Sequence, residues 1–359
     1  MRAWVQSAFG GPEVRRLDEV DPPRLRPDEV LVRVAAVALN RLDLLQREAP
    51  VVQTFQLPHI AGMDIVGTVA GSGGGAAAPD APTVGSVVLV DPVVSCEHCD
   101  FCLADLPMYC RHLRTIGSSR PGGLAELVAV PARNLHRLDV RADDLEALVA
   151  FASVPVASVT AWHALHGAGS MREGETVVVP GAGSGLGTAG VQLAKQAGCR
   201  TVSLIGAAGK RKAAERLGAD LVVDRRSTDW VEAVREFTQG RGADLVWDHV
   251  GGAFLQQAID ATRVGGRIVL SGTTAGGTST IANTSVFHWG RTLVGHGGYS
   301  RPEMAATIDA YVRGAIEPVV DSVWAFEELP AAEARLESGD FFGKIVVMGS
   351  DLPTPAASR

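Results

Sequence analysis

The chain has 359 residues, of which 46% are hydrophobic, so it can bury a sizeable core, and its length predicts two domains rather than one. The formal net charge of −7 and the scattered positions of the basic residues argue against the broad basic surface that nucleic-acid binding requires. The first residues lack a basic stretch followed by an apolar core, and no apolar run reaches the length of a membrane span. We therefore expect a cytoplasmic protein with no nucleic-acid or membrane partner.

Residues 1–150 favour β-structure. Runs at 29–39, 86–94 and 124–132 combine β-branched and other apolar residues, and Pro, Gly and Asp clusters separate them. This pattern predicts a mainly antiparallel domain. The low-complexity segment GSGGGAAAPDAP (71–82) is interpreted as a surface loop between two strands.

A different pattern begins near Thr176, where short β-favouring runs alternate with helical ones. Such alternation implies right-handed βαβ crossovers and a parallel sheet with helices on both faces. The expected strands are 176–179, 201–205, 221–224, 244–250 and 266–272, and the expected helices are 185–197, 210–217, 229–238, 253–263 and 303–313. Residues 319–348 are again β-rich, so we expect the chain to return there to its first domain.

The segment VVVPGAGSGLGTAGVQLAKQAG (177–198) places glycines where a buried strand enters a helix. Backbone N–H groups at a helix start have no partner within the helix and carry the positive end of its dipole, so they suit a pyrophosphate when side chains leave room. The glycines that leave this room are Gly181, Gly183, Gly185 and Gly187, although their spacing does not match G-x-G-x-x-G literally. We interpret the loop as a dinucleotide site, and a tight turn kept for packing alone is the alternative.

The strand after this helix bears on the form of the cofactor. In NAD-binding folds an acid near its end accepts hydrogen bonds from the adenosine ribose. Here residues 205–209 contain no carboxylate, and three cations follow that would pair with a 2′-phosphate, namely Lys210, Arg211 and Lys212. We therefore expect NADPH rather than NADH. The alternative is that these cations only form the solvated face of a helix.

Four cysteines occur in fifteen residues, CEHCDFCLADLPMYC, as a C-x2-C-x2-C-x7-C array. Such spacing allows four thiolates to converge on one zinc ion, and no coordination position then remains for substrate, so the zinc is expected to be structural. The expected ligands are Cys96, Cys99, Cys102 and Cys110. An iron–sulfur or redox cluster is the alternative. His98 is interpreted as a loop residue and Cys199 as a small buried residue.

Taken together, these features resemble the medium-chain dehydrogenase/reductase superfamily over nearly the whole chain. Further similar segments are TAWHAL (160–165), LGAD (217–220), DHVGG (248–252) and FGKIVV (342–347). The resemblance implies an α/β fold with a discontinuous, GroES-like β-rich catalytic domain and a doubly wound Rossmann domain, with substrate and nicotinamide meeting between them. The expected boundaries are 1–155 for the first part of the catalytic domain, 156–300 for the Rossmann domain, 301–350 for the last helix and the return, and 351–359 for a disordered tail.

Zinc-dependent alcohol dehydrogenases of this superfamily resemble one another in a cysteine within C-x-[ST]-D, a histidine in GHE and a later cysteine before a T-[GA]-[YW] segment. At the matching positions this chain has Asn40 in NRLD, Met63 in GMD and a residue near Val156. An amide, a thioether and an isopropyl group do not replace two thiolates and an imidazole around Zn²⁺. The chain therefore resembles the zinc-independent, quinone oxidoreductase-like branch, with its N-x-x-D segment.

Without a Lewis acid, hydride transfer is easier to a substrate that delocalises the incoming charge, such as a quinone or an α,β-unsaturated carbonyl. Asn40 and Asp43 are the expected catalytic residues, because they would place hydrogen bonds near the substrate; for Asp43 a structural role is the alternative. His59 is considered as a proton donor near neutral pH, the alternative being an ordinary loop histidine. The resemblance also assigns Phe287, His288 and Trp289, with His59, to the substrate pocket, a plain packing cluster being the alternative for the first three. It assigns Thr160, Ser184, Leu186, Val250 and Gly272 to the cofactor site.

The expected function is thus an NAD(P)H-dependent oxidoreductase that reduces a quinone or enone without a catalytic metal and carries one structural zinc per chain. The alternatives are a carbonyl or alcohol dehydrogenase working without zinc, and a nucleotide-binding protein with little turnover. Enoyl thioester reduction is disfavoured, because the tyrosine that some branches use is missing from 44–59. The expected partners are a small-molecule substrate and further copies of the chain, as a homodimer or homotetramer.

Overall fold

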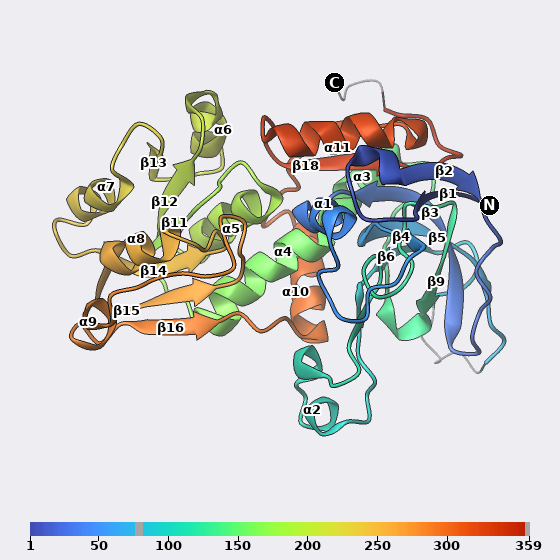
Figure 1. Cartoon of the computed structure of the whole chain (residues 1–359), viewed down its shortest axis with the longest axis horizontal. Helices are drawn as coiled ribbons and strands as arrows, with labels where there is room; N and C mark the ends of the chain where they lie inside the picture. Colours follow the sequence, from blue (N-terminus) through green and yellow to red (C-terminus); the bar gives the residue numbers. More distant parts are fainter. Residues whose placement is uncertain (76–81, 356–359) are drawn as a thin grey trace. The chain divides into compact units, whose positions relative to one another are not determined.

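The computed structural model describes residues 1–75 and 82–355, and the chain divides into two compact units (Figure 1). Unit 1 comprises Met1–Val156 and Pro318–Arg359, and unit 2 comprises Ala157–Glu317. The chain therefore passes through unit 2 and returns to unit 1, as the β-rich residues near its end predicted.

The second boundary differs from the expected one at residue 301. Helix α10 (Arg301–Val312) belongs to unit 2 rather than to the returning segment. It packs there because Met304 is completely buried and Tyr311 Oη lies 2.8 Å from Ser158 Oγ. The return thus begins only after this helix has ended.

Two expected flexible segments lie partly outside the described residues. These are 76–81 of the predicted surface loop and 356–359 of the predicted tail. Residues 351–355 of that tail are described, and Asp351 accepts a hydrogen bond of 3.0 Å from Arg33.

Within the described part of the chain, no single helix is long and apolar enough to cross a membrane. The consecutive helices Leu145–Ala152 and Pro155–Ala168 reach the required length and apolar character only when they are taken together, and a bend separates them.

Unit 1 is built on mainly antiparallel sheets, as predicted; β17 and β18 form a parallel pair. The larger sheet has the order β10-β6-β5-β3-β18-β17, with β9 also paired to β3. Its strands are β3 (Glu29–Ala38), β5 (Asp64–Ser72), β6 (Val87–Val90), β9 (Leu127–Pro131), β10 (Leu135–Arg137), β17 (Val320–Trp324) and β18 (Lys344–Met348). The smaller sheets contain β1 (Arg2–Gln6), β2 (Arg15–Glu19) and β4 (His59–Ile60), and β7 (Val93–Val94) with β8 (Arg114–Thr115).

The returning segment contributes a central strand and a helix to unit 1. Strand β18 pairs antiparallel with β3, and Figure 1 shows β18 and helix α11 (Leu329–Ser338), in red, against the blue amino-terminal elements. The helix was not predicted, because only the strands on either side of it were recognised. Its periodicity is nevertheless present, since Leu329, Ala332 and Leu336 are buried at helical spacing, and Gly339 ends it with φ +67°.

A buried ion network fixes helix α1 (Arg41–Glu48) against α11. Glu333 of α11 is 2% exposed and forms ion pairs with Arg15 of β2 and Arg47 of α1, the latter at 3.0 Å. Arg47 also pairs with Glu337. Because a buried charge without a partner is costly, this network holds α1, and with it Asp43, in one position.

Unit 2 has the alternating βα pattern that the sequence predicted. Its parallel sheet has the order β13-β12-β11-β14-β15-β16, the 3-2-1-4-5-6 order of a doubly wound dinucleotide fold. The strands are β11 (Thr176–Val179), β12 (Arg200–Ile205), β13 (Leu221–Asp224), β14 (Ala243–Asp248), β15 (Thr262–Leu270) and β16 (Thr292–Gly295). The helices are α5 (Gly185–Gln196), α6 (Arg211–Arg216), α7 (Trp230–Phe237), α8 (Phe254–Ala261) and α9 (Asn283–Phe287).

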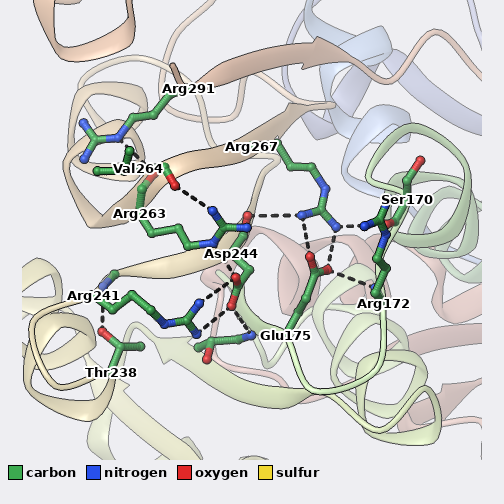
Figure 2. Close-up of polar contacts among 12 residues, drawn as sticks. Ser170, Arg172, Glu175, Thr238, Arg241, Asp244, Arg263, Val264, Arg267 and Arg291 are labelled. Atoms are coloured by element: carbon green, nitrogen blue, oxygen red, sulfur yellow. Dashed lines mark hydrogen bonds and ion pairs between the residues drawn. The ribbon is translucent and has the colours of Figure 1, made fainter. Parts of the chain in front are cut away.

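An ionic network joins the amino-terminal ends of these strands (Figure 2). Asp244, near the start of β14, is 4% exposed and accepts hydrogen bonds from Arg241, Arg263 and the N–H group of Thr176. Burial alone would raise the pKa of Asp244, but these donors outweigh it, so its pKa lies below the ordinary value. The carboxylate thereby ties β11 to β14 at the edge opposite the glycine loop.

Replacing Asp244 with Asn is expected to lower the free energy of unfolding by about 3 kcal/mol at pH 7, because the arginines lose a buried counter-charge. The wild-type advantage is fully present above the unfolded-state pKa of about 4 and is lost as the pH falls through the lower folded-state pKa. Urea unfolding at pH 7 and pH 3 measures both effects. Asp309→Asn, at an exposed pair with Arg313, is the control and should change stability little at either pH.

Candidate functional site

The glycine loop joins β11 to α5 in the predicted way. All four residues of β11 are buried, and the chain turns at Gly181 with φ +57°. Ser184 caps α5 by accepting a 3.0 Å hydrogen bond from the N–H group of Gly187. A Cβ atom at Gly187 would lie 2.2 Å from the carbonyl oxygen of Gly181, so only glycine allows the helix to start this close to the turn.

The start of α5 offers unused donors. Within residues 1–75 and 82–355, the N–H groups of Gly185 and Leu186 make no hydrogen bond. Val250 follows the carboxyl end of β14, beside β11, and the sheet order reverses at this point. Nearby, Asp248 Oδ2 is a buried acceptor that has no partner among the described residues. These residues therefore fit a dinucleotide, with a pyrophosphate at the helix start.

A further cation, which sequence reasoning missed, lies beside the end of β12. Lys210 and Arg211 follow this strand as expected, and Arg211 donates to the carbonyl oxygen of Val222 at 2.6 Å. Arg226 also belongs here, because a Cβ atom built on Gly206 would lie 3.9 Å from its Nε. The parallel pairing of β12 with β13 explains this, since Ile205 pairs with Asp224 and the loops after both strands emerge together.

Other residues assigned to the cofactor and substrate lie in two places. Gly272 follows β15 at the same sheet edge as the glycine loop, and the carbonyl oxygen of Thr160 accepts from His296 at 3.1 Å. The segment Phe287–Trp289 instead precedes β16, at the amino-terminal edge of the sheet, and the carbonyl oxygen of Trp289 accepts from the N–H group of Gly265. Because this edge is opposite the glycine loop, we do not retain Phe287, His288 and Trp289 as pocket residues.

The four predicted zinc ligands converge. The sulfur atoms of Cys96, Cys99, Cys102 and Cys110 all lie within 4.8 Å of one another. Four Zn–S bonds of about 2.3 Å in a tetrahedron place sulfur atoms about 3.8 Å apart, so the cluster fits a zinc ion. The His98 ring contacts the carbonyl oxygen of Cys96 and is not part of the cluster.

The thiols of this cluster differ in acidity. Backbone N–H groups lower the pKa of Cys99 to about 6, whereas burial raises that of Cys102 to about 11. A bound cation stabilises all four as thiolates. The backbone N–H groups of Cys96 and His112 donate to Cys110 Sγ at 3.2 and 3.4 Å and orient this ligand.

A second polar cluster forms in unit 1 where three strand ends meet. Strand β3 runs antiparallel to β5 and β18, so its carboxyl end lies beside their amino ends. Asn40 follows β3, while Asp64 and Lys344 begin the other two strands. Lys344 Nζ lies 2.8 Å from both Asn40 Oδ1 and Asp64 Oδ2.

The carboxylate of Asp64 is fully engaged. Its Oδ2 also accepts a 2.9 Å hydrogen bond from Asn40 Nδ2, and its Oδ1 accepts one of 2.7 Å from the N–H group of Val156. Asp64 and Lys344 are 0% and 5% exposed, so both charges are buried and neutralise each other. Sequence reasoning missed Lys344, because no local pattern distinguishes it in the strand GKIVVM.

Comparison with known proteins identifies the family. Residues 26–140 match the alcohol dehydrogenase GroES-like domain, and residues 185–313 match the zinc-binding dehydrogenase domain. The chain belongs to the medium-chain dehydrogenase/reductase superfamily.

Similar proteins in this superfamily differ in their named activities. An NAD-dependent alcohol dehydrogenase of Sulfolobus acidocaldarius is 29% identical, over 97% of this chain and 99% of its own. A 2-methylene-furan-3-one reductase of Solanum lycopersicum is 27% identical, over 97% of this chain and 79% of its own. The crystal structure of an NAD-dependent alcohol dehydrogenase, 33% identical, aligns with a TM-score of 0.89 over 97% of this chain and 99% of that chain. The protein is therefore an oxidoreductase of this superfamily.

The three positions that match the catalytic zinc ligands of alcohol dehydrogenases hold other groups in this chain. The side-chain amide of Asn40 donates to Asp64 and accepts from Lys344. Met63 offers only a thioether, and Val156 donates its backbone N–H group to Asp64. These residues do not fit a catalytic zinc ion.

Two further expectations concern Asp43 and His59. Asp43 Oδ2 accepts from the N–H group of Asn40 at 2.7 Å and Oδ1 from that of Gly62 at 3.2 Å. Burial raises the pKa of Asp43 to about 6. Because both carboxylate oxygens accept hydrogen bonds from backbone N–H groups, the structural alternative is favoured. His59 lies against Gly117 O at 3.2 Å, and burial lowers its pKa to about 4, so it is neutral at pH 7 and does not fit the expected proton donor.

Replacing Cys102 with Ser is expected to reduce bound zinc from one equivalent per chain to below about a tenth, because a hydroxyl is a poor zinc ligand. Metal analysis after exhaustive dialysis measures the change. Cys199→Ser, at a buried cysteine whose sulfur donates to the carbonyl oxygen of Arg172 at 3.1 Å, is the matched control and should retain zinc. Equal zinc in both variants would rule out the four-cysteine site.

Proposed function

We propose that this protein is an NADPH-dependent reductase that transfers hydride to a quinone or an α,β-unsaturated carbonyl compound without a catalytic metal. The observation that carries the proposal is the Asn40–Asp64–Lys344 cluster. It places a buried ammonium group among the positions that hold a catalytic zinc ion in the resembling alcohol dehydrogenases, and its own side chains cannot bind one.

The cofactor assignment is supported by the donor set of unit 2. The N–H groups of Gly185 and Leu186 suit the pyrophosphate, and Lys210 with Arg226 suits a 2′-phosphate. No carboxylate follows β12 to accept from a ribose hydroxyl. When bound, reduced nicotinamide supplies the hydride. The name of the Sulfolobus acidocaldarius relative favours NAD for that protein, so cofactor preference requires a direct test.

The substrate class follows from the missing Lewis acid. Hydride addition to a simple ketone leaves an alkoxide, which a metal ion stabilises in zinc enzymes. Addition to an enone or quinone spreads the same charge over a conjugated system, so hydrogen bonds are sufficient. The named substrate of the tomato relative, a 2-methylene-furan-3-one, has a carbon–carbon double bond conjugated to its ketone.

An apolar substrate is favoured by the loop after α1. A cavity of about 470 Å³ is lined there by Phe9, Pro50, Val51, Val52, Gln53, Phe55 and Leu57. The rings of Phe9 and Phe55 lie 5.7 Å apart in its wall. Because all but one of these side chains are apolar, we assign the hydrocarbon part of the substrate to this cavity.

The second candidate function is a carbonyl or alcohol dehydrogenase that works without zinc. The names of the Sulfolobus acidocaldarius relative and of the solved alcohol dehydrogenase structure favour it. The missing zinc ligands at Asn40 and Met63 disfavour it, because an alkoxide product has no conjugation to share its charge.

Self-association is also part of the proposal. Strand β16 ends the sheet of unit 2, and among the residues that the structure describes it pairs with β15 alone. The exposed side chains of Val264, Phe287 and Trp289 cluster at the start of these strands, with exposed fractions of 59%, 63% and 51%. An apolar sheet edge of this kind suits a second copy of the chain.

The proposed activity predicts NADPH oxidation with 2-cyclohexen-1-one or 1,4-benzoquinone, at turnover numbers on the order of 1 s⁻¹ or more. NADP⁺ should not be reduced with ethanol or 2-propanol. Absorbance at 340 nm measures both reactions on protein that carries one zinc per chain. Alcohol oxidation that disappears with a chelator, while the circular dichroism stays unchanged, would return the protein to the zinc-dependent enzymes.

The proposed cofactor preference predicts that Lys210→Ala combined with Arg226→Ala raises KM for NADPH by about tenfold or more, because two charge-assisted contacts to the 2′-phosphate are lost. KM for NADH should change less than about twofold. Arg216→Ala, at an exposed side chain at the end of α6, is the control. An equal increase for both cofactors in the double variant would contradict the assignment.

A further inference from the structure

The ammonium group of Lys344 has an unused donor. An ammonium carries three N–H groups, and the described residues accept only two of them, at Asn40 Oδ1 and Asp64 Oδ2. The side chain of Lys344 is 6% exposed, so bulk water does not satisfy the third one freely. A buried charged donor without an acceptor costs free energy, and such groups concentrate at functional sites.

The surroundings fix the direction of this donor. Asp64 cannot rotate away, because its other oxygen accepts the N–H group of Val156. Asn40 is held by Asp64 through its Nδ2 and by Asp43 through its backbone N–H group. Two rigid acceptors therefore constrain Lys344 Nζ, and the third N–H group is preorganised, which is the property that makes hydrogen-bond donors effective in catalysis.

We propose that Lys344 is a catalytic residue that donates its third N–H group to the carbonyl oxygen of the substrate and so replaces the missing Lewis acid. This inference rests on the proposed function and deepens it. It assigns the stabilising charge to the chain itself, and it distinguishes Lys344 from Asp64, Asn40 and Asp43, which are positioning residues.

Lys344 acts on the oxygen at which negative charge develops during hydride transfer. The β-carbon of the enone receives a hydride and forms a new C–H bond. The π pair of the C=C bond moves toward the α-carbon, the C=O π pair moves to oxygen, and an enolate oxyanion results. Lys344 donates a hydrogen bond to that oxygen and keeps its proton. The α-carbon then takes a proton from water, which restores the ketone.

The kinetic test uses a variant that removes both buried charges, Asp64→Asn with Lys344→Met, so that no unpaired carboxylate remains. The matched control is Asp321→Asn with Arg335→Met, which removes a bidentate ion pair of 3.1 Å between β17 and α11 in the same unit. We expect kcat with 2-cyclohexen-1-one to fall by about 10²–10³-fold in the first variant and less than about threefold in the control. The Kd for NADPH should be unchanged in both.

A second measurement does not depend on turnover. 4-Nitrophenol in the presence of NADP⁺ and zinc-loaded protein is titrated spectroscopically, because its phenolate resembles the enolate oxyanion. Wild-type protein should lower the pKa of the bound phenol by one unit or more, and the Asp64→Asn/Lys344→Met variant should not.

Ethylammonium added to Lys344→Ala should restore part of the lost kcat, since it supplies the same donor.

The outcomes separate the inference from the function beneath it. If wild-type protein reduces neither enone nor quinone but still lowers the phenol pKa through Lys344, the proposed function fails and the donor assignment stands. If wild-type protein reduces the enone and the variant retains its kcat, the function stands and the inference is wrong. If the wild-type protein does not lower the phenol pKa, the donor assignment is also overturned.

Discussion

A buried carboxylate that needs a positive partner organises unit 1. Asp64 begins β5, and its partner Lys344 lies 280 positions later in the sequence, at the start of β18. Asp64 is completely buried, and removing one member of such a pair typically costs about 3–5 kcal/mol, so the returning segment must place β18 beside β3 with Lys344 at this sheet edge. The ion pair therefore links the two parts of a discontinuous unit and forms the cluster to which we assign the chemistry.

Unit 2 provides the partial positive charge of backbone N–H groups rather than a charged side chain. Its parallel strands end at one edge of the sheet, where the N–H groups at the start of α5 have no partner among the described residues and a dinucleotide fits. Asp244 and its arginines stabilise the opposite edge through an ionic network (Figure 2). The amino-terminal edge of the sheet thus contributes stability, and the carboxyl edge offers the donors for a cofactor. A fold built in this way tolerates changes in the binding loops while its strands stay in register.

Local patterns explain how much the sequence could predict. The alternating strands and helices of unit 2, the glycine loop and the cysteine array each lie within a short segment, so periodicity and spacing were sufficient. Lys344 and Arg226 could not be found in this way, because antiparallel and parallel pairing bring them to their partners from distant segments. The segment Phe287–Trp289 was assigned by resemblance alone, and the order of the strands places it at the edge opposite the glycine loop. Burial, which no local pattern gives, decided the state of His59.

The most direct measurement follows the hydride itself. Zinc-loaded protein is incubated with NADPH carrying deuterium at C4 of the nicotinamide and with 2-cyclohexen-1-one, and the product is analysed by NMR. A metal-free reductase of conjugated carbonyl compounds places deuterium on the β-carbon and yields cyclohexanone. Deuterium on the carbonyl carbon, with 2-cyclohexen-1-ol as product, would show carbonyl reduction and contradict the account.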